Sequence, residues 1–275
     1  MALHTHRFAI IGAGSIGRAL IAGMLKGEDV PREQIHATRK SENRLEEVRE
    51  AFPGIEVSAD NERAVQDASV IVLSVKPQQA ARVIEEIRQH VQSGTLIISV
   101  LAGLTTHSIA QLFDQRLPIV RAMPNTPAMI DAGATAIALG PHCKAEHGAI
   151  ATALFEAVGS VEEIEEYLMD AVTGLSGSGP AYVFMFIEAL TDAGVKQGLP
   201  RSIAARLATQ TVYGASKLVR DTGKHPAILR DEVTTPGGTA IAATSELESH
   251  GLRTMLIKAV ATATERSKQL SSPEE

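Results

Sequence analysis

The sequence contains no tryptophan and only one cysteine, and just 3% of its 275 residues are aromatic. A single cysteine, Cys143, excludes a disulfide within the chain and favours a reducing compartment, so we expect a cytoplasmic protein. With so few aromatic side chains, the core must be built from Ala, Val, Ile and Leu. No apolar run approaches the roughly 20 residues that span a bilayer, which argues against membrane insertion.

Charge and histidine spacing exclude further classes of partner. The formal net charge is −6, from 26 basic and 32 acidic residues, which argues against a nucleic-acid-binding surface. His142 and His147 flank Glu146 but do not form the H-E-x-x-H spacing of a zinc site, and no other histidine stands in a ligand pattern. The sequence therefore predicts neither nucleic-acid binding nor a metal site.

A glycine-rich turn follows the first apolar segment of the chain. Gly12-x-Gly14-x-x-Gly17 joins a short buried strand to a helix. Gly12 permits a tight turn, Gly14 lets a pyrophosphate approach the backbone, and Gly17 lets helix and strand pack closely. The first N–H groups and the positive dipole end of the helix attract phosphate. The turn predicts dinucleotide binding by Gly12, Gly14, Ser15, Ile16 and Gly17.

Strand-like and helical segments alternate through the first half of the chain. Such alternation predicts a parallel, doubly wound sheet of the Rossmann type, which we place in a domain of residues 1–164. The expected strands are 8–11, 35–38, 55–57, 69–75, 95–100 and 119–123, extended by 134–139 and 161–164. The expected helices between them are 15–26, 42–52, 61–66, 77–91 and 105–113.

The carboxyl ends of these strands meet at one edge of the sheet, where such folds bind their ligands. The second strand ends in Thr38-Arg39-Lys40-Ser41, without the acid that usually binds the ribose 2′-OH of NAD. A guanidinium at Arg39, helped by Lys40, can instead hold a 2′-phosphate, at roughly 2–3 kcal/mol. We therefore predict that the protein prefers NADPH to NADH, which would bind more weakly. The alternative is that Arg39 and Lys40 are merely solvated. Ala102, at the end of the fifth strand, is a further candidate cofactor residue.

The second half, residues 165–275, is predicted to be all-helical. A helix is expected over 169–175, a break over 176–180, and then a helix to about residue 197 with Pro180 in its first turn. Residues 181–187 are apolar on almost every side, so we expect them to be buried. Further helices are expected over 202–220, 239–249 and 252–270. An apolar helical half after a Rossmann domain often packs against its own copy, which favours a homodimer.

Thr235-Pro236-Gly237-Gly238-Thr239 interrupts these helices. Pro-Gly-Gly before a helix can point consecutive N–H groups at one spot, with two threonine hydroxyls beside them. This arrangement suits a small anion such as a carboxylate. The alternative is a tight turn between helices, with Thr239 only capping the second one. His225-Pro226, just upstream, is interpreted as a turn.

Five blocks of sequence together resemble the pyrroline-5-carboxylate reductases. They are the N-terminal glycine turn, Ser74–Gln78, and residues 120–128, 176–182 and 231–239. The resemblance implies NAD(P)H-dependent reduction of 1-pyrroline-5-carboxylate to L-proline, the last step of proline biosynthesis. It also implies an interlocked homodimer through the helical domain, often assembled further into a decamer.

The same resemblance assigns roles to individual residues. It implies that Asn61 and the Ser74, Val75, Lys76 and Pro77 loop line the cofactor. It further implies that the substrate carboxylate binds the second-half loop, through Thr235, Gly237, Gly238 and Thr239. Thr239 is then the residue that positions the substrate, and no general acid is assigned because a cyclic imine can enter already protonated.

One departure from the family pattern keeps an alternative open. Ala240 stands where the family commonly has threonine, which alters the ring side of the site. A related reductase of pyrroline-2-carboxylate or piperideine carboxylate is therefore a second hypothesis. A β-hydroxyacid dehydrogenase is disfavoured because residues 179–187 contain no lysine to serve as its acid or base. A non-catalytic NADP-binding regulator is the alternative from another class.

Overall fold

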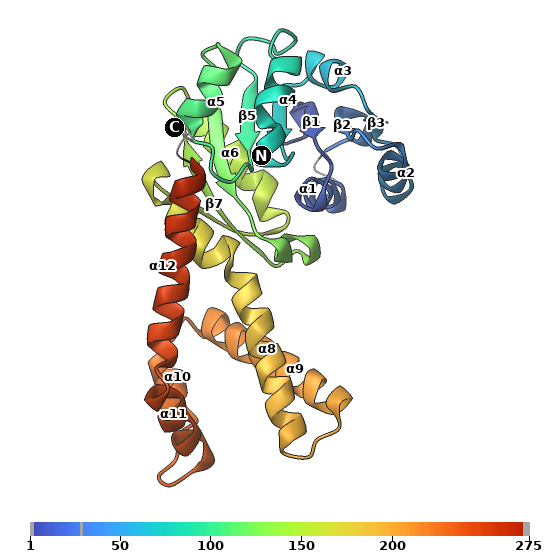
Figure 1. The fold of residues 1–275 in the computed structure, drawn as a ribbon. Coiled ribbons are helices and arrows are strands. Elements are labelled where there is room, and N and C mark those ends of the chain that lie inside the picture. Colours follow the sequence, from blue (N-terminus) through green and yellow to red (C-terminus); the bar gives the residue numbers. More distant parts are fainter. Residues whose placement is uncertain (1–2, 28–29, 272–275) are drawn as a thin grey trace. The chain divides into compact units, whose positions relative to one another are not determined.

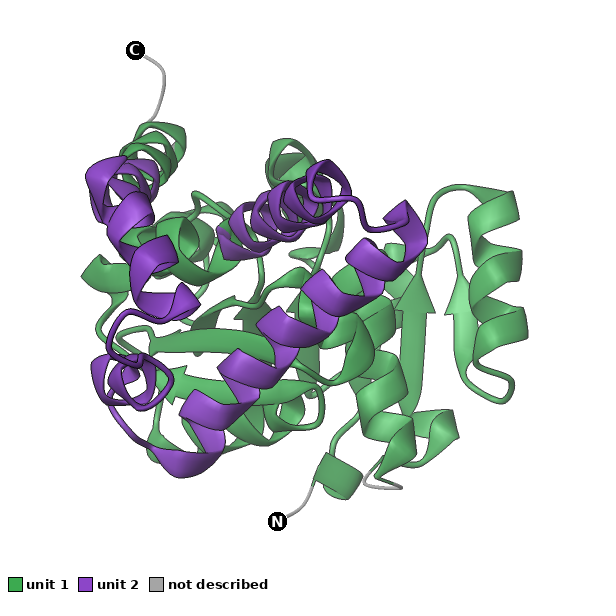
Figure 2. Cartoon of the chain, turned by 90° about the horizontal axis from the view of Figure 1, so that it is seen from below, with its two compact units in different colours: residues 1–178, 262–275 green, residues 179–261 purple. Residues whose placement is uncertain are grey.

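A computed structural model describes residues 3–27 and 30–271 of the protein. The chain divides into two compact units, one of residues 1–178 with 262–275 and the other of residues 179–261 (Figure 2). The first unit contains the sheet, and the second is helical (Figure 1). Within the described ranges, no helix is both long enough and apolar enough to cross a membrane.

The first unit is built on an eight-stranded sheet with the order β3-β2-β1-β4-β5-β6-β7-β8. Its first five strands form the doubly wound arrangement predicted from the sequence, with every neighbouring pair parallel. In chain order the strands are β1 (Phe8–Ile11), β2 (Ile35–Thr38), β3 (Glu56–Ser58), β4 (Val70–Leu73), β5 (Leu96–Ser99), β6 (Ile119–Met123), β7 (Gly133–Leu139) and β8 (Gly159–Glu163).

One strand departs from the predicted parallel order. β7 runs antiparallel to β6, because only the short 3-10 segment Thr126–Ile130 lies between them. A parallel return needs a crossover of a dozen or more residues. The helix α6 (Ala145–Glu156), which the sequence pattern did not reveal, provides that crossover between β7 and β8, and these two strands are parallel.

Helices cover both faces of the sheet. Along β1, Phe8 and Ile10 belong to the core under α1, α2 and α6, whereas Ala9 and Ile11 belong to the core under α3, α4 and α5. Burial on both faces explains the continuous apolar strands. The remaining helices of this group are α1 (Ser15–Lys26), α2 (Glu42–Ala51), α3 (Asn61–Gln66), α4 (Ala80–Ile87) and α5 (Thr106–Phe113). α4 is shorter than predicted, because Pro77–Gln79 forms a 3-10 turn.

The helices that follow begin within the first unit. α7 (Met169–Val172) passes into a π-helical turn, Thr173–Gly177, so the predicted break shrinks to Ser178. The later helices are α8 (Gly179–Lys196), α9 (Arg201–Thr222), α10 (Pro226–Glu232), α11 (Thr239–Ser249) and α12 (Leu252–Ser271). The last part of α12 belongs to the first unit, where Ser267 Oγ donates to Asp170 Oδ1 at 2.6 Å.

The predicted burial of residues 181–187 is wrong for the chain by itself. Phe184 is 63% exposed and Met185 is 69% exposed on α8. α8 packs mainly on α9, and Thr191 is the one buried residue of this helix. The apolar pattern of residues 181–187 therefore indicates a surface for association with a partner. A large exposed apolar patch is unusual on a monomer.

A buried arginine links the sheet to the segment that precedes α7. Arg121 on β6 is 2% exposed, and its Nη1 lies 3.6 Å from Glu166 Oε1. Glu166 also accepts hydrogen bonds from the Thr106 N–H and hydroxyl, both at 2.7 Å. Arg121 Nε and Nη2 have no hydrogen-bond partner within the described part of the chain. Glu166 is thus the counter-charge of a buried guanidinium whose other two nitrogens have no hydrogen-bond partner among the described residues.

We expect Glu166→Ala to lower the free energy of unfolding by about 3–5 kcal/mol, because it leaves a buried charge unpaired. Arg121→Met removes that charge and leaves Glu166 bonded to Thr106 and partly solvated, so it should lower stability by less than about 2 kcal/mol. Urea unfolding of both variants at one protein concentration measures the difference. An Arg121→Met variant as unstable as Glu166→Ala would contradict this interpretation.

Candidate functional site

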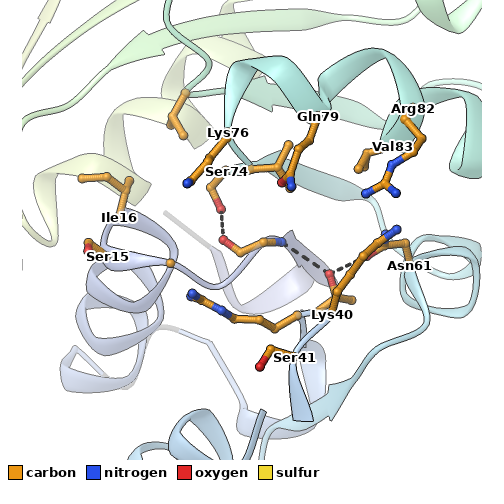
Figure 3. A pocket seen from close by; sticks show the side chains of 16 residues that line it. Ser15, Ile16, Lys40, Ser41, Asn61, Ser74, Lys76, Gln79, Arg82 and Val83 are labelled. Carbon is orange, nitrogen blue, oxygen red and sulfur yellow. Dashed lines mark hydrogen bonds between the residues drawn. The ribbon is translucent and has the colours of Figure 1, made fainter. Parts of the chain in front are cut away.

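A cavity of about 560 Å³ lies at the carboxyl edge of β1, β2 and β4 (Figure 3). This is the edge at which doubly wound sheets bind ligands. Four of its described lining residues are basic and none is acidic. The lining residues are Gly12, Gly14, Ser15, Ile16, Thr38, Arg39, Lys40, Ser41, Asn61, Ser74, Val75, Lys76, Gln79, Arg82, Val83 and Val100.

The glycine turn leaves room for a ligand against its backbone. Gly12 has φ +91°, and a Cβ there would lie 2.7 Å from Val75 Cγ1, so only glycine fits. Gly14 is the N-cap of α1 and offers no side-chain cap. The first N–H groups of that helix have no intrahelical partner, so they suit an anion such as a pyrophosphate. Gly17 lies outside the cavity, where an added Cβ would come within 3.0 Å of Ile10 and Ser74.

Side chains from β2 and β4 hold the glycine turn in place. Ser74 Oγ donates to the carbonyl oxygen of Gly12 at 2.8 Å. On the other side, Thr38 Oγ1 accepts from the Gly12 N–H at 3.4 Å and donates to Asn61 Oδ1 at 2.7 Å. Asn61 is only 3% exposed, so its amide is fixed in this network. Ser74 and Asn61 thus shape the cavity as well as line it.

Arg39 and Lys40, which follow β2, both line the cavity. Arg39 Nη1 donates to the carbonyl oxygen of Ala13 at 2.6 Å, which places the guanidinium beside the glycine turn. Lys40 Nζ lies 3.3 Å from Glu86 Oε2 on α4. Lys76 and Arg82 add two more positive charges to the lining. The charge of this cavity suits a ligand with several phosphate groups.

The predicted cofactor residues and the observed lining agree except at a few positions. Gly17, Pro77 and Ala102 do not line the cavity. Pro77 begins the 3-10 turn before α4 instead. The prediction missed Gln79, Arg82 and Val83, whose i, i+3, i+4 spacing on one helical face was the available signal. It also did not include Thr38, Ser41 and Val100 among the site residues.

The predicted substrate loop lies in the second unit and forms a turn. The Gly238 N–H donates to the Thr235 carbonyl at 2.9 Å, with Pro236 and Gly237 between them and φ +68° at Gly237, as in a type II turn. A Cβ on Gly238 would collide with Thr235 Oγ1. α11 begins at Thr239 without a side-chain cap, so the N–H groups of its first turn can bind an anion.

The segment before this loop is helical, where the sequence suggested only a turn at His225-Pro226. Pro226 starts α10, and His225 Nδ1 accepts from the Ala227 N–H at 3.2 Å. His225 is therefore occupied as a cap and is not part of the loop. Cys143 is also outside the site: its Sγ lies 3.2 Å from the Ile119 carbonyl, and burial raises the pKa of its thiol. A thiolate nucleophile is thus disfavoured.

Two family models match the two halves of the chain. A model described as NADP oxidoreductase, coenzyme F420-dependent, matches residues 7–103. A model described as pyrroline-5-carboxylate reductase dimerisation matches residues 166–270. The first match includes every lining residue of the cavity named above, and the second includes the loop of residues 235–239.

Similar solved structures cover nearly the whole chain. A pyrroline-5-carboxylate reductase from Coxiella burnetii superposes with a TM-score of 0.92 at 36% identity, covering 98% of this chain and 99% of that one. A Plasmodium falciparum pyrroline carboxylate reductase with NADP bound has a TM-score of 0.88 at 29% identity, covering 98% and 100%.

Curated relatives agree with these structures. The pyrroline-5-carboxylate reductase of Arabidopsis thaliana is 41% identical over 96% of this chain and 95% of its own length. That of a Synechocystis species is 43% identical over 96% of this chain and 98% of its own length. Identity at this level along both chains shows that the protein belongs to the pyrroline-5-carboxylate reductase family.

Proposed function

We propose that this protein uses NADPH to reduce 1-pyrroline-5-carboxylate to L-proline, the last step of proline biosynthesis. The observation that carries the proposal is the basic cavity beside the glycine turn, in a chain of this family. Its glycine turn admits no side chain at Gly12, and its described lining has four basic residues and no acid. We expect NADH to bind more weakly, because only the 2′-phosphate uses the cations at the β2 end.

The chain's own residues bind and orient the cofactor in this proposal. The backbone of Gly12, Gly14, Ser15 and Ile16 holds the pyrophosphate at the N-terminus of α1. Arg39 and Lys40 hold the 2′-phosphate through charge-assisted hydrogen bonds. When bound, NADPH supplies the hydride for the imine carbon.

The loop of residues 235–239 holds the substrate in this proposal. The N–H groups at the start of α11 and the hydroxyls of Thr235 and Thr239 bind the carboxylate. Because a cyclic imine can enter protonated, the residues need to position it and need not supply a strong acid. Ala240, the next residue, has a methyl group at the position where the family commonly has threonine.

We place the cofactor domain at residues 1–164 and the substrate and dimerisation domain at residues 165–275. The protein acts as a homodimer through the second domain, with a decamer as the larger assembly. Supporting this, α8 exposes Phe184 and Met185, and α12 exposes Ile257 at 69%. Covering such apolar side chains is the main driving force of subunit association. A cytoplasmic location stays a prediction.

Turnover of several cyclic imines tests the proposed reaction. With NADPH oxidation as the readout, we expect kcat/KM for pyrroline-5-carboxylate to exceed that for pyrroline-2-carboxylate and the piperideine carboxylates. A preference for either of the latter would favour the ketimine reductase to which Ala240 points. No turnover of any of them, with intact NADPH binding, would favour a non-catalytic regulator.

Arg39→Asp should lower kcat/KM for NADPH about a hundredfold and leave NADH within a few-fold, because it replaces a charge-assisted contact with a repulsive one. Arg116→Asp is the matched control. Arg116 is exposed in the loop before β6, at the opposite edge of the sheet. If the ratio of kcat/KM for NADPH to kcat/KM for NADH is unchanged in Arg39→Asp, the assignment of the 2′-phosphate site is refuted.

Thr239→Val should raise KM for the imine roughly ten- to hundredfold, because it removes a hydroxyl that bonds a carboxylate. The Kd for NADPH should stay the same. Thr222→Val controls for loss of a threonine hydroxyl in this unit, since Thr222 Oγ1 donates to the Leu218 carbonyl at the end of α9. Weakened NADPH binding with an unchanged imine KM would move the substrate site away from this loop.

A further inference from the structure

Glu86 on α4 lies beside the cofactor cavity, although it does not line it and the proposed function gives it no role. Its Oε1 accepts from Asn61 Nδ2 at 3.0 Å, and its Oε2 lies 3.3 Å from Lys40 Nζ. Its side chain is 27% exposed. A carboxylate is therefore held in place by two residues that do line the cavity.

The position of Glu86 on its helix directs it to one end of the cavity. Gln79, Arg82 and Val83 line the cavity, and Glu86 follows on the same helical face, four residues after Arg82. Figure 3 shows the Lys40 amine and the Arg82 guanidinium pointing toward the Asn61 end of the cavity. Lys76 points from the other end. The Glu86 carboxylate thus lies next to the Lys40 ammonium, outside the cavity lining.

The β2 end is where a doubly wound fold places the 2′ group of the adenosine ribose. In NAD sites an acid on the second strand accepts a hydrogen bond from the 2′-OH, and its charge disfavours a 2′-phosphate. β2 of this chain ends at Thr38, and the residues that follow it, Arg39, Lys40 and Ser41, include no acid. In this structure a carboxylate reaches that end from a different element, since Glu86 on α4 contacts Lys40 and Asn61 there.

We propose that Glu86 is a specificity-determining residue that limits the preference of this enzyme for NADPH over NADH. The proposal rests on the proposed function. The carboxylate occupies one of the three donors of Lys40 and lies close enough to repel a phosphate bound there. An ammonium can hold both groups, so the phosphate still binds, but against the charge of Glu86. Asn61 keeps the carboxylate from turning away into solvent.

Glu86→Gln removes the charge and keeps an oxygen that can accept from Asn61. Equilibrium binding of NADP⁺, NAD⁺ and 2′,5′-ADP to the free enzyme, by calorimetry, measures the effect without any turnover. We expect NADP⁺ and 2′,5′-ADP to bind about tenfold more tightly, and NAD⁺ to change less than about twofold. Glu86→Ala should also raise the affinity for NADP⁺ relative to that for NAD⁺. In Glu86→Asp, which keeps the charge, both affinities should stay near those of the wild type.

Glu85→Gln is the matched control, because it makes the same charge change on the same helix. Glu85 is 65% exposed and bonds to Arg88 at 2.8 Å, outside the cavity lining. If the preference in binding affinity for NADP⁺ over NAD⁺ is unchanged or reduced in Glu86→Gln, the proposal is overturned. Glu86 would then serve only to order Lys40 and Asn61. An equal gain in Glu85→Gln would overturn it too, because the effect would be one of net charge.

These outcomes separate this proposal from the proposed function. If the wild type binds NADP⁺ but does not reduce pyrroline-5-carboxylate, the reaction is wrong and the binding data still decide the role of Glu86. If the wild type binds neither NADP⁺ nor 2′,5′-ADP, both proposals fall.

Discussion

The backbone of the glycine turn passes so close to the end of β4 that no side chain fits between them. Val75 occupies the space that a Cβ on Gly12 would need, and the Ser74 hydroxyl bonds the Gly12 carbonyl. This contact sets where α1 begins and therefore where its free N–H groups lie. Thr38 fixes the same turn from β2. The proposed phosphate site depends on three parallel strands that end side by side at the turn.

The four cations around this turn make different contacts. Arg39 bonds the turn itself, Lys40 is shared with Glu86, and Lys76 and Arg82 lie on elements that follow β4. A carboxylate behind one of four cations adjusts the strength of phosphate binding without removing it. In the proposed reaction the residues need only bind and orient the two reactants. A protonated imine accepts a hydride from the cofactor without a protein acid.

The sequence was sufficient for features that depend on local pattern. Apolar runs located most of the strands, and the Gly12-x-Gly14-x-x-Gly17 spacing located the turn between β1 and α1. It was less informative where tertiary contacts decide. β7 reverses because its connection to β6 is short, and Arg82 and Glu86 reach the site only through the packing of α4. The apolar run on α8 was visible, but a single chain does not bury it, since its burial depends on association.

Reduction with NADPH that carries deuterium at the transferred position of the nicotinamide tests the proposed reaction most directly. Mass spectrometry and NMR of the product should show L-proline with one deuterium, at the ring carbon that was double-bonded to nitrogen in pyrroline-5-carboxylate. This result requires hydride transfer from the cofactor to that imine carbon. Proline without deuterium, or no proline while NADPH binds normally, would contradict the proposed function.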